Sequence, residues 1–226
     1  MKSGQSVGNA GQKYKLLIFD WDGTLMDSSE RIVRCMHQAA LSFQLPLADP
    51  AAIRDIIGLS LEIGAERLYP GLSDEQFSAF VAEFRRQSLG NEIEACQLFD
   101  GVKLILQSLS ERGYYLSVAT GKSRRGLDQD FRKHGMEGLF PISRTGDEAF
   151  SKPHPLMLEE ILTDYNLDVD VALMIGDTEY DLQMAANAGM DSLAVSYGVH
   201  SAERLLAQRP QGLIERFDQL PDWLNK

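Results

Sequence analysis

Hydrophobic and polar positions along the chain form two alternating kinds of segment. Short, continuous apolar runs are typical of parallel strands that are buried on both faces, and apolar residues at three- and four-residue spacing are typical of helices. The continuous runs cover residues 15–19, 114–120, 171–176 and 192–197. The helical pattern covers residues 101–112, 123–134, 154–165 and 179–188. Strands that alternate with helices predict an α/β fold with a doubly wound, mainly parallel sheet, as in Rossmann-like cores.

A second region has helical spacing alone and lies between the first two predicted strands. Its helices are predicted over residues 28–45, 50–57, 60–69 and 73–90, with proline and glycine at the breaks. We therefore predict an α-helical cap, residues 28–98, that is inserted into a core formed by residues 15–27 and 99–226. Residues 213–224 are expected to add a short strand or turn and a closing helix to this core.

Composition narrows the class of protein. A hydrophobic content of 44% in 226 residues is enough for a substantial core. The net charge of −11 argues against nucleic acid or an anionic membrane surface as the main partner, because such binding depends on clustered Lys and Arg. The two cysteines, Cys35 and Cys96, form no C-x-x-C motif, which argues against a disulfide framework and a cysteine metal site.

The first 14 residues are rich in Gly, Ser, Gln and Asn and are expected to form a disordered tail. They lack the apolar run of a secretory signal, and no stretch of the sequence reaches the roughly 18 apolar residues of a membrane span. We therefore expect a cytoplasmic protein without a membrane partner, present as a monomer or a weak dimer.

Carboxylates directly follow two of the predicted strands. Asp20 and Asp22 come after the first apolar run, and Asp177 and Asp181 come after the third. In a doubly wound sheet, ligands bind at the carboxyl ends of the strands, so these four charges are expected to lie close together. A hard divalent cation such as Mg²⁺ would hold them there, because it prefers carboxylate oxygens, retained waters and a substrate phosphate.

The same strand ends carry the parts of a phosphoryl-transfer site. A carboxylate such as Asp20 can act as a nucleophile and form an aspartyl-phosphate. Asp22, two residues on, can protonate the leaving oxygen and later deprotonate the attacking water. Thr120 and the backbone N–H groups that follow it can donate to phosphoryl oxygens, and Lys152 can neutralise charge that builds on them.

Four motifs in this order resemble the haloacid dehalogenase-like superfamily, and more narrowly its branch resembling phosphoglycolate phosphatase. The first, D-x-D-G-T-L-x-D-S, matches residues 20–28, and the fourth, G-D-x-x-x-D, matches residues 176–181. The second motif, a Ser or Thr after a strand, matches Thr120 in VATGK, and the third, a lysine, matches Lys152 in SKPHP. The resemblance extends over residues 15–222.

The resemblance implies a role for each matching residue. The implied catalytic residues are Asp20, Asp22, Thr120 and Lys152. The implied Mg²⁺ ligands are Asp20, Asp22 through its backbone carbonyl, and Asp177. Asp181 is implied to lie next to these ligands without binding the metal itself. The residues implied to bind substrate are Trp21 through its backbone N–H, Thr120, Gly121, Lys152, Arg54 and Gly58. Arg54 and Gly58 belong to the part of the insert that resembles a cap turn facing the active site in relatives.

Differences among relatives favour phosphomonoester hydrolysis. Dehalogenase relatives lack the second Asp of the first motif, which this chain has as Asp22. Phosphonate-cleaving relatives need a cap lysine, and residues 28–98 contain none; sugar phosphomutase relatives carry a cap-hinge His where this chain has Ile32. We expect an Mg²⁺-dependent phosphatase that acts on a small phosphorylated metabolite, with 2-phosphoglycolate favoured. A pyrophosphatase or nucleotidase of the same branch, and a non-catalytic protein that binds a phosphometabolite, are the alternatives.

Overall fold

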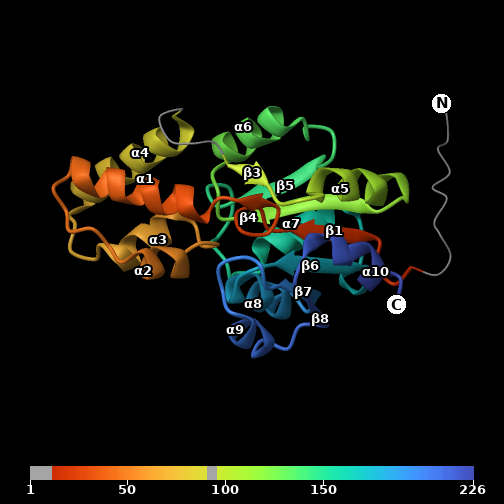
Figure 1. Ribbon diagram of the computed structural model, residues 1–226. Helices are drawn as coiled ribbons and strands as arrows, with labels where there is room; N and C mark the ends of the chain where they lie inside the picture. Colours follow the sequence, from red (N-terminus) through yellow and green to blue (C-terminus); the bar gives the residue numbers. More distant parts are fainter. Residues whose placement is uncertain (1–11, 91–95) are drawn as a thin grey trace.

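The computed structural model describes residues 12–90 and 96–226 (Figure 1). Its centre is a six-stranded sheet in which the strand order is β5-β4-β1-β6-β7-β8 and every neighbouring pair is parallel. The strands are β1 (Leu16–Phe19), β4 (Tyr115–Thr120), β5 (Ile142–Thr145), β6 (Ala172–Gly176), β7 (Asp191–Val195) and β8 (Gly212–Ile214). The strand order reverses beside β1, which makes the sheet doubly wound and confirms the predicted fold class.

Helices cover both faces of this sheet (Figure 1). They are α5 (Val102–Glu111), α6 (Arg124–His134), α7 (Leu156–Tyr165), α8 (Glu179–Asn187), α9 (Ala202–Leu206) and α10 (Leu220–Leu224), with 3₁₀ turns at Val169–Val171 and Phe217–Gln219. Side chains of β1 alternate between two cores: Leu17 and Phe19 pack with α5, α6 and α10, and Leu16 and Ile18 pack with α7 and α8. Burial on both faces explains why this run is apolar throughout.

The segment between β1 and α5 forms a separate helical layer. Its two ends are joined by an antiparallel pair of short strands, β2 (Met26–Asp27) and β3 (Gln97–Leu98). Its helices are α1 (Ser29–Ser42), α2 (Pro50–Asp55), α3 (Leu61–Leu68) and α4 (Asp74–Leu89). They share a hydrophobic core of their own around Met36, Ile53 and Phe80, and they project beyond the end of the sheet (Figure 1). We call α1–α4 the helical cap.

Some elements depart from the sequence prediction. β5 was not expected, because Ile142, Ser143 and Arg144 are only half-buried at the edge of the sheet and form no continuous apolar run. α9 and the two-residue strands β2 and β3 are too short for their pattern to be distinguished from a loop. The segment predicted over residues 213–224 forms β8, a 3₁₀ turn and α10. Among the described residues, none of the helices combines the length and the apolar character needed to cross a membrane.

The predicted N-terminal tail, residues 1–14, needs one correction. Residues 1–11 lie outside the described residues, whereas Tyr14 is buried. Its ring stacks on Trp223 with 6.1 Å between the ring centroids, and its hydroxyl donates to Asp191 at 2.9 Å. The ammonium group of Lys13 lies 2.7 Å from the same carboxylate. Tyr14 therefore belongs to the packed core, because the C-terminal helix covers its ring, and Lys13 is exposed beside it.

Candidate active site

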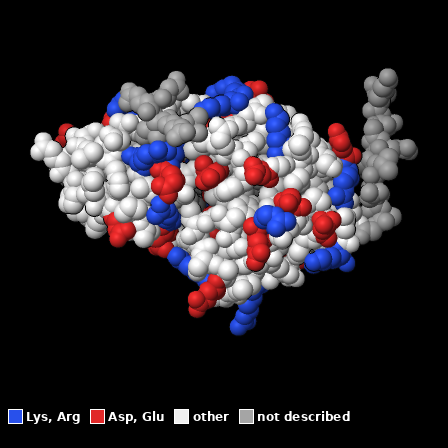
Figure 2. All heavy atoms as spheres, in the orientation of Figure 1, with Lys and Arg blue, Asp and Glu red and all other residues white. Residues whose placement is uncertain are grey.

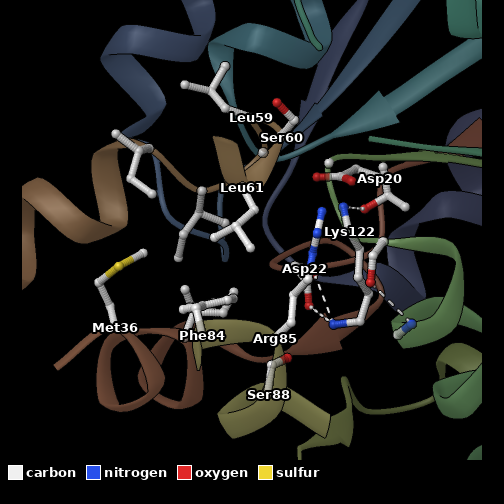
Figure 3. Close-up of a pocket in the computed structure, with 18 of the residues that line it drawn as sticks. Asp20, Asp22, Met36, Leu59, Ser60, Leu61, Phe84, Arg85, Ser88 and Lys122 are labelled. Carbon is white, nitrogen blue, oxygen red and sulfur yellow. Dashed lines mark hydrogen bonds and ion pairs between the residues drawn. The ribbon is translucent and has the colours of Figure 1, made fainter. Parts of the chain in front are cut away.

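Three chain segments reach the same edge of the sheet and carry predicted site residues. Asp20 follows β1, Thr120 ends β4 and Asp177 follows β6. Because β1 pairs with both of the other strands, these residues leave the sheet side by side. Figure 3 shows Asp20, Asp22 and Lys122 together on one side of a pocket.

Three buried carboxylates form a cluster at this edge. One oxygen from each of Asp20, Asp177 and Asp181 lies within 4.8 Å of the other two. Oδ1 of Asp20 accepts a hydrogen bond from the backbone N–H of Trp21 at 2.7 Å and lies 2.8 Å from Nζ of Lys152. Oδ2 of Asp20 is buried and has no hydrogen-bond partner among the described residues. This oxygen is therefore an acceptor that the protein itself leaves unsatisfied.

The other two carboxylates are held by loop residues that follow the strands. Asp177 accepts from the hydroxyl of Thr24 at 2.7 Å and from the backbone N–H of Val199 at 2.9 Å. Asp181 accepts from the backbone N–H of Thr178 at 3.0 Å and from its hydroxyl at 2.7 Å. Thr178 is the N-cap of α8 and Asp181 is the third helical residue, so a reciprocal capping box fixes this carboxylate.

Lys152 is the cation of this cluster. Its side chain is fully buried, and Nζ lies 2.8 Å from Oδ1 of Asp20 and 2.6 Å from Oδ1 of Asp181. Burial by itself would lower the pKa of Lys152, but the charges of Asp181 and Asp20 outweigh this effect and raise the pKa. Lys152 is therefore charged and balances part of the negative charge of the three carboxylates.

The carboxylates carry more negative charge than one lysine balances. Burial raises the pKa of Asp177 to about 7, and the negative charge of Asp181 adds to the shift. Burial also raises the pKa of Asp20 well above its usual value, although Lys152 acts in the opposite direction. A divalent cation would supply the missing compensation. The three clustered carboxylates of Asp20, Asp177 and Asp181 fit Mg²⁺, which prefers hard oxygen ligands.

Two glycines leave room beside Asp177. A Cβ atom at Gly23 or at Gly198 would lie 2.2 Å from Oδ2 of Asp177, which is closer than any real carbon–oxygen contact. Gly23 also has a φ of +87°, a conformation that side chains strongly disfavour. Glycine at both positions allows two loops to approach this carboxylate closely.

Asp22 belongs to a second hydrogen-bonded chain. Nζ of Lys122 lies 3.2 and 3.3 Å from the two carboxylate oxygens of Asp22, and 3.3 Å from Oδ2 of Asp130. Asp130 in turn accepts from the indole N–H of Trp21 at 2.9 Å. The ring of Trp21 is fully buried, and its backbone N–H donates to Asp20. The expected contact between that N–H and a phosphoryl group stays a prediction.

A pocket lies between these strand ends and the helical cap (Figure 3). From the core it is lined by Asp20, Asp22, Thr120, Gly121 and Lys122, among others. From the cap it is lined by the turn between α2 and α3, which includes Gly58, and by residues of α1 and α4. The structure thus brings Thr120, Gly121 and Gly58 to one cavity. We call this cavity the cap pocket.

The predicted cap residue Arg54 lies outside the cap pocket. Its guanidinium group pairs with Glu30, and its neighbour Ile53 occupies the core of the cap. The arginine that lines the pocket is Arg85 of α4, which the sequence did not single out. Helical spacing gives the buried face of each helix but not how four helices are placed around a cavity, so no local signal identified Arg85.

The helical cap is seated directly on the core. A Cβ atom at Gly121 would lie 2.1 Å from the backbone oxygen of Leu59, so the loop after β4 touches the cap turn. The backbone N–H of Ser60 donates to the hydroxyl of Ser151 at 2.8 Å, and Ser151 directly precedes Lys152 in the chain. These contacts join the cap turn to the loop after β4 and to the loop that carries Lys152.

The motifs and this geometry agree with a match to a protein-family model. The model described as haloacid dehalogenase-like hydrolase matches residues 17–195. The chain belongs to this family. The sequence resemblance is thereby confirmed, and the buried carboxylates and Lys152 lie within the matched region.

Relatives within the family are phosphatases by name. The protein named "Probable phosphatase IndB" from Dickeya dadantii is 35% identical over 211 residues, which cover 91% of each chain. A phosphoglycolate phosphatase from Vibrio vulnificus is 29% identical over 223 residues, 93% of this chain and 96% of its own. The crystal structure of a predicted phosphatase from Clostridium acetobutylicum superposes with a TM-score of 0.83 at 25% identity, covering 93% of this chain and 98% of that one. These similarities confirm the predicted branch of the family and the hydrolase class.

Proposed function

We propose that this protein is an Mg²⁺-dependent phosphatase that hydrolyses a small phosphomonoester through an aspartyl-phosphate on Asp20. The observation that carries the proposal is the unsatisfied Oδ2 of Asp20, buried at the end of β1 beside the ammonium group of Lys152. A buried acceptor without a partner is costly unless a ligand satisfies it. An oxygen in this position can form a bond to phosphorus.

In the first step, Oδ2 of Asp20 attacks the phosphorus atom and the bond from phosphorus to the leaving oxygen breaks. Asp22 gives a proton to that oxygen, so the alcohol leaves neutral. Thr120 and Lys152 stabilise the charge on the transferring oxygens by hydrogen bonding and by positive charge. Asp20, Asp177 and the backbone carbonyl of Asp22 would hold Mg²⁺, which would supply further positive charge at the phosphoryl group.

In the second step, Asp22 takes a proton from water and the water oxygen attacks the same phosphorus atom. The bond to Asp20 breaks, inorganic phosphate leaves and the carboxylate of Asp20 is restored. Asp181 contributes by position alone, because its two oxygens are occupied by Lys152 and by Thr178. It orients Lys152 beside the nucleophile.

The substrate class is small and anionic, and 2-phosphoglycolate is the reference substrate that relatives suggest by name. Pyrophosphate and mononucleotides are the alternatives within the same branch. Nucleic acid is not a partner in this proposal: the net charge is −11, and on the face in Figure 2 the Lys and Arg side chains are scattered among Asp and Glu. Location in the cytoplasm and a monomer or weak dimer complete the proposal.

Phosphate release from a panel of phosphomonoesters, pyrophosphate and mononucleotides tests this function, with Mg²⁺ and with EDTA. We expect turnover with Mg²⁺ only, and none for Asp20→Asn. Asp170→Asn is the matched control, because Asp170 is exposed and far from the site in the fold. Acid quenching followed by mass spectrometry should detect phosphate on the peptide that contains Asp20. Full activity of Asp20→Asn would contradict the nucleophile, and tight binding of a phosphometabolite without turnover would favour a binding protein.

A further inference from the structure

The cap pocket has two chemically different sides. The core contributes the carboxylates, Thr120 and Lys122, whereas the cap contributes mainly hydrocarbon. The apolar lining residues are Ile32, Met36, Ile56, Ile57, Leu59, Leu61, Phe84 and Leu89. Figure 3 shows Leu59, Leu61, Met36 and Phe84 around the hollow, opposite Asp20 and Asp22. The part of a substrate beyond its phosphoryl group therefore meets an apolar wall.

The cations that line the cap pocket are already paired with carboxylates. Arg85 projects from α4 toward the core, and its guanidinium group lies 2.5 Å from Oε1 of Glu62 on the neighbouring helix α3. Lys122 lies 3.2 Å from Asp22 and 3.3 Å from Asp130. Each of these two cations therefore has a carboxylate partner among the described residues, and a second anionic group on a substrate would have to compete with that partner.

This arrangement disfavours a charged leaving group. A carboxylate or second phosphate next to the apolar wall would lose its hydration and would have to compete with Glu62 or Asp22 for a cation. An alkyl or aryl group in the same place would be stabilised by the area that it removes from water.

Resting on the proposed phosphatase function, we infer that the substrate is a phosphomonoester whose leaving alcohol is uncharged and has an apolar body of several carbons. Glycolate, phosphate and nucleosides lack this combination. Selectivity therefore comes from the cap side of the pocket, and the phosphoryl group is bound by the core in the same way for every substrate.

The test measures kcat/KM for a series of n-alkyl phosphates from ethyl to hexyl. It also compares kcat/KM for two esters of similar shape, isobutyl phosphate and 2-phosphoglycolate. Isobutyl phosphate replaces the carboxylate of 2-phosphoglycolate by an isopropyl group, so that two methyl groups stand in place of the two oxygens and the branching is kept. We expect kcat/KM to rise about fourfold for each methylene that enters the pocket. We also expect kcat/KM for isobutyl phosphate to exceed kcat/KM for 2-phosphoglycolate by at least about tenfold.

Two variants make a cation available in the pocket, one by changing the apolar wall and the other by breaking the ion pair of Arg85. Leu61→Lys adds an unpaired cation, and Glu62→Gln releases Arg85 without changing the wall. In each variant, kcat/KM for 2-phosphoglycolate should rise about tenfold relative to kcat/KM for isobutyl phosphate. Leu41→Lys is the matched control, because Leu41 is exposed on α1 outside the pocket, and it should leave the ratio unchanged.

The outcomes separate the two proposals. If neither these esters nor any member of the panel described above is hydrolysed, the phosphatase function is overturned. If the esters are hydrolysed but kcat/KM stays constant or falls with alkyl length, or if the natural chain prefers 2-phosphoglycolate, the proposal of an apolar leaving group is overturned. The proposed phosphatase function then still stands. If Leu61→Lys does not fold, the alkyl series and Glu62→Gln still decide the question.

Discussion

Nζ of Lys152 lies 2.8 Å from Oδ1 of Asp20, and both side chains are buried. Removal of one member of a buried ion pair leaves an uncompensated charge, which costs about 3–5 kcal/mol. Lys152→Met should therefore lower the free energy of unfolding of the metal-free protein by roughly this amount and abolish phosphate release. Urea denaturation in EDTA at pH 7 measures the change. Lys15→Met, at an exposed position next to β1, is the control and should change neither quantity.

Asp177 makes the stability of the metal-free protein depend on pH. Burial raises its pKa to about 7, whereas the unfolded chain loses the same proton near pH 4. The contribution of this group to stability is complete below about pH 4 and is lost as the pH rises through 7. The expected slope is up to about 1.4 kcal/mol per pH unit.

Urea denaturation in EDTA at several pH values between 5 and 7.5 measures this slope. The difference between the natural chain and Asp177→Asn isolates the group, because asparagine does not titrate in this range. Saturating Mg²⁺ should make the free energy of unfolding of the natural chain less dependent on pH, since Mg²⁺ binds the deprotonated carboxylate. Identical curves for the two chains in EDTA would contradict the raised pKa.

Gly198→Ala should weaken the metal site specifically. Its Cβ atom would lie 2.2 Å from Oδ2 of Asp177, so either the carboxylate or the loop must move. We expect Mg²⁺ to bind at least about tenfold more weakly, as measured by calorimetry and by the Mg²⁺ dependence of phosphate release. Gly138→Ala is the matched control, because a Cβ atom there meets nothing within 4 Å. Equal Mg²⁺ affinity in the two variants would show that the close approach does not matter for the metal.

Asp22→Asn should reveal proton transfer to the leaving group. The side chain keeps its size and can still accept from Lys122, but it cannot donate a proton as an acid does. We expect kcat to fall about 10²- to 10⁴-fold for alkyl phosphates. The first step should fall much less for aryl phosphates, whose leaving oxygens need less protonation. Single-turnover measurements compare the two, and an equal loss would exclude Asp22 as the general acid.

The central strands and the motif residues could be predicted from sequence because their signals are local. β1 and β6 are buried on both faces, so each appears as one apolar run with its carboxylate directly after it. β5 could not be predicted, because an edge strand with Ser143 and Arg144 half-exposed has no such run. Tyr14 was assigned to the tail because one tyrosine carries no sign that a C-terminal tryptophan covers it.

The parts of the site that sequence did not predict depend on contacts between distant segments. Thr24 and Val199 both hold Asp177, yet neither belongs to the fourth motif that contains it. Lys122 follows Thr120 in the sequence, but its pairing with Asp22 appears only when β1 and β4 are neighbours. Arg54 was preferred over Arg85 because family resemblance points to a cap turn, whereas the packing of α4 decides which arginine lines the pocket.

The pairing of β2 with β3 has a consequence for the diversity of such enzymes. Met26 is opposite Leu98, so the polypeptide leaves the catalytic sheet and returns to it at adjacent points. A different folded insert whose ends lie equally close could therefore join the core at the same two points in place of α1–α4. Evolution, or an engineer, can exchange the part that selects the alcohol while the machinery that breaks the phosphate ester stays in place.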